Sequence, residues 1–208
     1  MKRTFALFFA FFLAVTAFAQ TPEEIIARME GEMEKHEKDG LIMTMDVKIP
    51  IIGTMSTKVY ALGEKSRIEA KVKGEQIITW SDEETEWEYN SKKNEIEITR
   101  VRNSSGTSND GGEAELFTSV ADGYDVTLKK ETTDAWFFVC KKNKDNKDKD
   151  APKTMELDIA KGSYLPLRLS AKISGLGMTM RDISFGVTEE QVTFNPKDYP
   201  TAKIIDKR

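Results

Sequence analysis

The sequence predicts a mainly β protein of the α+β class, built on one antiparallel sheet of about eleven strands. Most of the chain alternates apolar and polar residues with a period of two, and short turn sequences separate these segments. Only two stretches have helical spacing, so the alternating strand–helix rhythm of a parallel sheet is missing. A sheet of this size should curl through its twist, and its concave face must then be filled by side chains, a helix or a ligand.

A helix is expected at residues 22–38. Thr21 can cap its start, Pro22 suits the first turn, and two acidic residues follow at the positive end of the helix dipole. The apolar residues then recur at helical spacing: Ile25, Ile26, Met29 and Met33. Asp39-Gly40 ends the helix.

The pattern then changes to strands. In residues 41–49 the odd positions form one apolar face: Leu41, Met43, Met45, Val47 and Ile49. Further strands are expected at residues 54–62, 65–72, 76–81, 85–89, 95–102, 125–130, 134–141, 154–159, 164–173 and 178–187. Glycine, asparagine and aspartate fill the short connections, which favours hairpins between consecutive strands.

Two longer connections interrupt the strands. Residues 103–112 are small and polar and predict a loop, which a short internal helix at 113–121 follows. Residues 141–150 are rich in lysine and aspartate. They lack the spacing and closing glutamate of a calcium loop, so they predict a solvated hairpin loop.

The composition argues against several classes of function. Cys140 is the only cysteine and His36 the only histidine, so no intrachain disulfide, zinc cluster or thiol–histidine pair is expected. Cys140 lies in an apolar run and is expected to be a small buried hydrophobe. The net charge of −4, with interspersed signs, argues against nucleic acid as a partner. We expect no cofactor, no metal and no enzymatic activity.

The first nineteen residues predict a signal peptide. Lys2 and Arg3 precede an apolar run at residues 5–15, and Ala17-Phe18-Ala19 forms a cleavage pattern. The mature chain would begin at Gln20, which is not a cysteine and therefore predicts no lipid anchor. Residues 20–208 are expected to form one domain of a soluble, exported, monomeric protein.

Methionine is unusually frequent within the predicted strands, where β-branched residues are more usual: Met43, Met45, Met55, Met178 and Met180. Several strands, such as residues 135–140, are apolar at consecutive positions and therefore on both faces. Two interpretations remain open: a large core between helix and sheet, or an adaptable apolar binding surface.

The stretch from residue 67 to 98 resembles the family of the outer-membrane lipoprotein carrier LolA. The matching positions are Arg67 on one strand, Ser81 and Asp82 at the end of the next, and Trp87 and Tyr89 on a third. The glycine that follows the aspartate in the family is Glu83 here. The tail is similar too, because the family closes with a Phe-x-x-Pro strand and a short Val/Ile-Asp tail, comparable to residues 192–196 and 202–208.

This resemblance implies an incomplete antiparallel β-barrel whose concave face is covered by the N-terminal helix and the internal helix. It implies a periplasmic protein that binds lipoprotein acyl chains, with an inner-membrane donor complex and an outer-membrane acceptor as partners. Arg67 would fasten the helical lid, and Asp82 would stabilise a turn through its side chain. The candidate cavity residues are Met43, Met45, Val47, Trp87, Tyr89, Trp136, Phe138, Met178 and Met180.

The function predicted from the sequence is therefore carriage of lipoproteins, or of related lipids, towards the outer membrane. The alternative is a regulatory domain on the same scaffold that senses a lipid or a protein and transports nothing. Each buried CH₂ of an acyl chain contributes about 0.8 kcal/mol. A carrier must unload its cargo, so its cavity should be shallow, soft or partly closed when empty.

Overall fold

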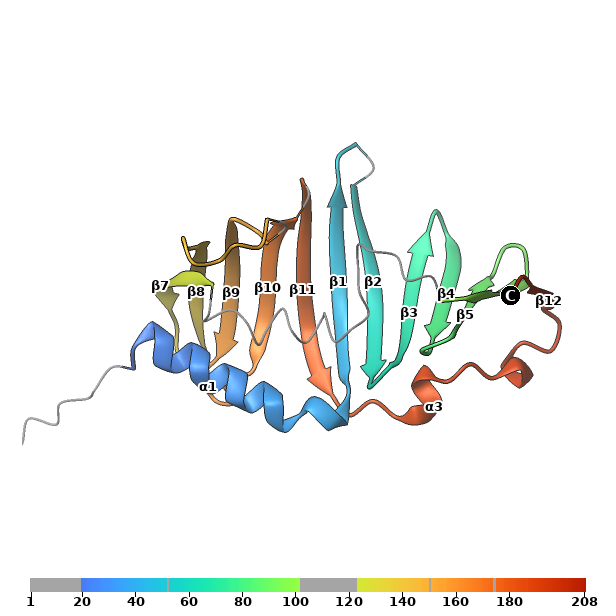
Figure 1. Cartoon of the computed structure of the whole chain (residues 1–208), viewed down its shortest axis with the longest axis horizontal. Coiled ribbons are helices and arrows are strands. Elements are labelled where there is room, and N and C mark those ends of the chain that lie inside the picture. The colour runs from blue at the N-terminus through green and yellow to red at the C-terminus, as the bar shows by residue number, and fades with distance from the viewer. Residues whose placement is uncertain (1–19, 52, 102–122, 150, 174) are drawn as a thin grey trace, which may run out of the picture.

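The computed structural model describes residues 20–51, 53–101, 123–149, 151–173 and 175–208. The expected signal peptide and the expected helix at 113–121 lie outside these residues. Within them, the chain forms one twelve-stranded sheet with helical segments at both ends of the sequence (Figure 1). The elements are α1 (Pro22–Lys35), a 3₁₀ turn (Glu37–Asp39), β1 (Leu41–Ile49), β2 (Gly53–Leu62), β3 (Lys65–Val72), β4 (Glu75–Ser81), β5 (Thr85–Asn90), β6 (Glu95–Arg100), β7 (Tyr124–Glu131), β8 (Ala135–Lys142), β9 (Thr154–Ala160), β10 (Pro166–Ile173), β11 (Leu176–Phe185), α3 (Glu189–Val192), a second 3₁₀ turn (Pro196–Asp198) and β12 (Lys203–Asp206).

The strand order is β12-β6-β5-β4-β3-β2-β1-β11-β10-β9-β8-β7, and the two ends of the sheet do not meet. Neighbouring strands are antiparallel, except that β12 runs parallel to β6. The central pair is β1 and β11, which joins the meander of β2–β6 to the meander of β7–β10. The predicted mainly β, incomplete antiparallel barrel is thereby confirmed.

The helix α1 begins with a capping box. The Thr21 hydroxyl accepts from the Glu24 backbone N–H at 3.2 Å, and the Glu24 carboxylate accepts from the Thr21 N–H at 3.0 Å. Its apolar stripe, Ile25, Ile26, Met29 and Met33, is buried against one face of the sheet, which we call the helix face. The sequence pattern thus predicted both the helix and its buried side.

The core under α1 is formed by β1, β2 and the strands of the second meander. Its buried sheet residues are Leu41, Met43, Val59, Tyr124, Trp136, Phe138, Cys140, Met155, Leu157, Ile159, Leu169 and Met180. On β8 these are the even-numbered residues, whereas Ala135, Phe137 and Val139 point to the opposite face. Burial under α1 accounts for the even-numbered apolar residues of β8. It does not account for the apolar residues at the odd-numbered positions, which lie on the opposite face.

The opposite face, which we call the tail face, is covered over β2–β6 by the C-terminal segment, residues 186–202. Val187 and Val192 pack with Tyr60, while the aromatic rings of Phe194 and Tyr199 lie on the strands beyond. Residues 192–196 form the end of α3 and an irregular stretch, so the Phe-x-x-Pro strand implied by the resemblance is wrong here. The two covering segments therefore lie on opposite faces of the sheet.

Candidate functional site

Four of the predicted cavity residues form the solid core directly under α1. Met43 and Phe138 are at most 1% exposed, Met180 is 4% exposed and Trp136 is 8% exposed. All four belong to the same apolar cluster as the stripe of α1. They can contact a ligand only if α1 moves away from the sheet.

Three other predicted residues, Met45, Val47 and Met178, are half-buried on the same face, and Met45 packs against the core under α1. The strand register aligns them with apolar neighbours: Val47 pairs with Met55 on β2 and with Met178 on β11, and Met178 pairs with Ala171 on β10. We call these five half-buried residues the apolar strip: Met45, Val47, Met55, Ala171 and Met178. The strip continues the buried core towards the end of the sheet that α1 does not reach (Figure 1).

The N-terminal end of α1 is held to the sheet by polar and aromatic contacts. The Tyr164 hydroxyl donates to the Gln20 side-chain oxygen at 2.9 Å, and the Arg28 guanidinium lies 4.0 Å from the centroid of the Tyr164 ring. The Tyr164 ring in turn packs on Trp136, with centroids 5.2 Å apart. The stripe of α1 is otherwise held by packing of apolar side chains, two of them methionines, which adapt easily to displacement.

Trp87 and Tyr89 lie on the tail face, and the structure does not bring them together with the methionines. The Trp87 ring stacks on Phe194 with centroids 5.6 Å apart, and the Tyr89 and Tyr199 ring centroids are 4.4 Å apart. Both aromatic residues therefore hold the C-terminal segment on the sheet. Trp87 and Tyr89 are two residues apart on β5 and therefore point to the same face of the sheet. Which face this is depends on the strand pairing across the sheet, which the sequence resemblance does not give.

Arg67 also lies on the tail face, remote from α1. Its guanidinium lies 5.7 Å from the ring centroid of Tyr60 and 5.4 Å from that of Trp80, and it pairs with Glu69 at 2.8 Å. The Nε atom is buried and has no hydrogen-bond partner among the described residues. The covering element near Arg67 is the C-terminal segment, and any fastening by this residue would act on that segment.

Asp82 shapes the turn between β4 and β5. Its carboxylate accepts from the backbone N–H of Glu84 at 2.9 Å and of Thr85 at 2.7 Å. Glu83 is not among the residues with positive φ, so this turn does not require the glycine that the family has at that position.

A polar groove of about 510 Å³ lies on the part of the tail face that the C-terminal segment leaves open. It crosses β2, β1, β11, β10 and β9, and its lining is mainly charged or hydroxylic. Sequence reasoning did not single it out. The signal was present in β1, where the even positions Thr44, Asp46 and Lys48 are polar between apolar odd positions.

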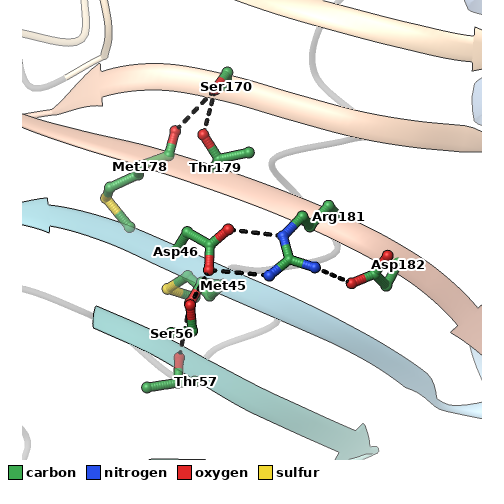
Figure 2. Close-up of polar contacts among 9 residues, drawn as sticks. All are labelled: Met45, Asp46, Ser56, Thr57, Ser170, Met178, Thr179, Arg181 and Asp182. Atoms are coloured by element: carbon green, nitrogen blue, oxygen red, sulfur yellow. Dashed lines mark hydrogen bonds and ion pairs between the residues drawn. The ribbon is translucent and has the colours of Figure 1, made fainter. Parts of the chain in front are cut away.

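Asp46 organises one wall of this groove (Figure 2). Its carboxylate accepts from Arg181 Nε at 2.7 Å and Nη2 at 3.3 Å, and from the Ser56 hydroxyl. The hydrogen bond from Arg181 is the main cause that lowers the pKa of Asp46, against the opposing effect of burial. On β9, the groove residue Glu156 accepts from Arg168 at 3.2 Å, and Arg168 also donates to Asp158 at 2.7 Å.

Within the part of the chain that the structure describes, no set of three or more histidine, cysteine, aspartate or glutamate side chains is arranged to hold a metal ion. None of the helices in the described ranges combines the length and apolar character needed to cross a bilayer.

No family model matches the sequence, and no curated protein matches it. Among solved structures, an uncharacterised conserved protein from Thermus thermophilus is 21% identical, with 90% of this chain and 100% of that chain covered and a TM-score of 0.47. Lipoprotein LppX from Mycobacterium tuberculosis is 13% identical over 81% of this chain and 98% of its own, with a TM-score of 0.49. A LolA superfamily protein from Nitrosomonas europaea is 11% identical over 86% and 100%, with a TM-score of 0.33.

At these identities and TM-scores the likeness concerns the course of the chain alone. The open antiparallel sheet with an N-terminal helix on one face is part of the arrangement that the sequence resemblance implies.

Proposed function

We propose that the helix face binds the acyl chains of lipoproteins, or of related lipids, and that the protein carries them through the periplasm towards the outer membrane. The observation that supports this is the apolar strip. It extends the buried core beyond α1 as a row of half-buried apolar side chains on four adjacent strands, without a charged residue in the row. A flexible hydrocarbon chain needs a surface of this kind and few specific polar contacts.

The helix α1 serves as a lid in this proposal. A chain that first contacts the strip could displace α1 and extend over Met43, Phe138 and Met180. Burial of each CH₂ contributes about 0.8 kcal/mol, and separating α1 from the sheet consumes part of that gain. The net affinity then stays low enough for release without an energy source, which a shuttle between membranes requires.

The donor and acceptor follow from the resemblance to LolA. In this proposal the chain receives cargo from an inner-membrane complex and passes it to an acceptor at the outer membrane. The binding step itself can be tested without either partner.

The test uses displacement of a fluorescent acyl probe from the purified chain and a pair of adjacent variants on β11. Met178 and Thr179 point to opposite faces of the sheet, because Met178 pairs with Val47 and Thr179 pairs with Asp46. Met178→Asn should weaken probe binding by about tenfold or more, since it places a polar amide in the apolar strip. Thr179→Asn should leave it unchanged. Absence of probe uptake at micromolar concentrations, or equal effects of both variants, would contradict the proposal.

A second candidate function is regulation through a bound protein or lipid, without transport. The polar groove favours it, because its lining presents charges of both signs to a polar partner: Asp46, Glu156, Lys48 and Lys172. Depletion in cells separates the two functions. Mislocalised lipoproteins support carriage, whereas normal sorting with an altered stress response supports regulation.

A further inference from the structure

The turns at the two ends of the strands differ in charge, and we call each set of turns an edge of the sheet. Because consecutive strands are antiparallel, alternate turns lie on the same edge. The turns β1–β2, β3–β4, β5–β6, β8–β9 and β10–β11 lie on the edge away from α1, which we call the lysine edge (Figure 1). Among the described residues, the basic members of these turns are Lys73, Lys92, Lys93, Lys144, Lys147, Lys149 and Lys153, and the acidic members are Asp145 and Asp148.

The other edge is acidic. In the turns β2–β3, β4–β5, β7–β8 and β9–β10, the described acidic residues are Glu64, Asp82, Glu83, Glu84 and Asp134, and the described basic residue is Lys161. The helix α1 runs along this edge and contains five glutamates against Arg28 and Lys35. The net charge of −4 therefore conceals a basic edge and an acidic edge on opposite ends of the strands.

An apolar tip projects from the lysine edge. Figure 1 shows the β1–β2 hairpin extending furthest from this side of the sheet. At its turn Ile51 is 108% exposed, and its backbone φ is 72°. A β-branched residue is strongly disfavoured at positive φ, where glycine or asparagine would fit. Neither packing nor backbone conformation therefore explains an isoleucine at this position.

The residues around Ile51 are also apolar. Pro50 precedes it, and Ile49 ends β1. The register that pairs Lys48 with Gly177 places Ile49 beside Leu176, at the end of β11. Lys48 and Lys172, the second-last residues of β1 and β10, both pair with Gly177 of β11 and lie next to this apolar group on the tail face.

We propose that the lysine edge docks on an anionic lipid bilayer, with Ile51 inserted among the lipids and the lysines on the headgroups. A single projecting apolar residue amid long, exposed cationic side chains matches a soft interface that is apolar inside and negative outside. A protein partner would need a complementary pocket for Ile51 and paired acids for the scattered lysines. A bilayer instead offers an apolar interior and anionic headgroups at every lateral position, so it needs neither a shaped pocket nor matched acids.

The geometry relates this edge to the apolar strip, although the docking does not depend on acyl-chain binding. Val47 and Met178 are two residues from the β1 and β11 ends at the lysine edge, whereas α1 covers the other end of these strands. A docked molecule would therefore turn the uncovered part of the helix face towards the lipid.

The insertion can be followed by a probe on the tip. Cys140 is fully buried, so Ile51→Cys provides one reactive thiol for an environment-sensitive dye. Leu167→Cys is the matched control, because Leu167 is 47% exposed and lies near the opposite edge. Vesicles of phosphatidylcholine with about 30% phosphatidylglycerol should raise and blue-shift the emission at position 51 only. An unchanged emission at position 51, or equal changes at both positions, would overturn the proposal.

The contributions of apolar insertion and charge can be separated by co-sedimentation with the same vesicles. Ile51→Asn suits the positive φ and should weaken vesicle binding by about tenfold, the effect of removing one large apolar side chain from a membrane. Lys147→Glu with Lys149→Glu should weaken it by about tenfold or more and leave little salt dependence. Lys38→Glu with Lys197→Glu, which changes charge equally at exposed sites elsewhere, should change it little.

The acyl-probe assay on the same variants distinguishes this proposal from the carrier function. Ile51→Asn should retain full probe binding, because Ile51 is outside the apolar strip. Vesicle binding that depends on Ile51 in a chain without probe uptake would support docking and reject carriage. Probe uptake in a chain that ignores vesicles, or whose vesicle binding is unaffected by Ile51→Asn, would reject docking.

Discussion

Arg181 on β11 reaches diagonally across the central strand pair to form a two-pronged ion pair with Asp46 on β1, at 2.7 Å and 3.3 Å. Arg181 is directly opposite Thr44, and a register shift follows immediately, where Asp182 has a φ of 55°. This bulge keeps Ile183 and Phe185 packed against the helix-face core after the irregularity. The pair thus joins the two meanders at the place where their register changes.

Removal of the Asp46 charge should destabilise the fold. Asp46→Asn loses charge-assisted hydrogen bonds from Arg181, and we expect the free energy of unfolding at pH 7 to fall by about 1–3 kcal/mol in denaturant titration. Asp182→Asn changes an exposed partner of the same arginine and should cost at most about 0.5 kcal/mol. Equal losses for the two variants would contradict the central role of Asp46.

The same pair predicts a pH dependence. The pKa of Asp46 is lowered in the folded state, so its stabilising contribution is present above the unfolded value of about 3.9 and is lost as the pH falls further. The difference in unfolding free energy between the wild type and Asp46→Asn should therefore shrink as the pH falls below about 4. A difference that stays constant down to pH 2.5 would contradict this assignment.

Cys140 should resist modification in the folded protein. It is fully buried, and burial raises the pKa of its thiol to about 11. A chromogenic disulfide reagent at pH 8 should label it within minutes in denaturant but only over hours without it. Because the folded pKa is raised above the unfolded value of about 8.5, the associated stability should be complete below that pH and decline towards pH 11. Rapid labelling of the native chain would show that the helix-face core is open.

Loss of the Phe194 ring should loosen the C-terminal segment. The ring contacts Trp80 and Trp87, with centroids 5.4 Å and 5.6 Å away. Phe194→Ala should lower the unfolding free energy by about 2 kcal/mol, less than for a fully buried ring because Phe194 is half-buried. Ile204→Ala, at a side chain that is 53% exposed, should cost well under 1 kcal/mol. Limited proteolysis near residues 193–202 should become faster only in the first variant.

If α1 is a lid, weakening its attachment should speed entry of the acyl chain. Tyr164→Phe removes the hydrogen bond to Gln20 but retains the ring that stacks on Trp136. One such bond contributes about 1 kcal/mol, so stopped-flow uptake of the acyl probe should accelerate by up to about fivefold. Slower or unchanged uptake, with the fold intact by circular dichroism, would contradict a lid role for α1.

Local patterns predicted most of the strands and α1. β1 and β3 cover residues 41–49 and 65–72 as expected. The boundaries of the other expected strands differ by one to two residues, because turn residues and two-residue periodicity locate a strand only to within a few positions. The helix expected at 22–38 stops at Lys35 and ends in a 3₁₀ turn before Gly40, whose φ is 71°. The strand β12 was not expected, since its pairing with β6 is set by contacts about a hundred residues apart.

The faces of the sheet were harder to predict than its strands. Periodicity places Trp87 and Met178 on one side of their own strands, but only the pairing across four intervening strands shows that these sides are opposite. The polar groove was missed for a related reason. In the sequence, Asp46 and Arg181 are each ordinary charged strand residues. Local patterns do not show that they form an ion pair, because they are far apart in the chain.

The most direct test of acyl-chain binding on the helix face is photo-cross-linking with a diazirine-bearing palmitate, followed by peptide mapping. If the helix face binds acyl chains, cross-links should concentrate on the apolar strip, chiefly at Met45, Val47 and Met178, and should fall sharply in Met178→Asn. Cross-links located in the polar groove around Ser170 and Thr179, or no saturable labelling at all, would contradict it.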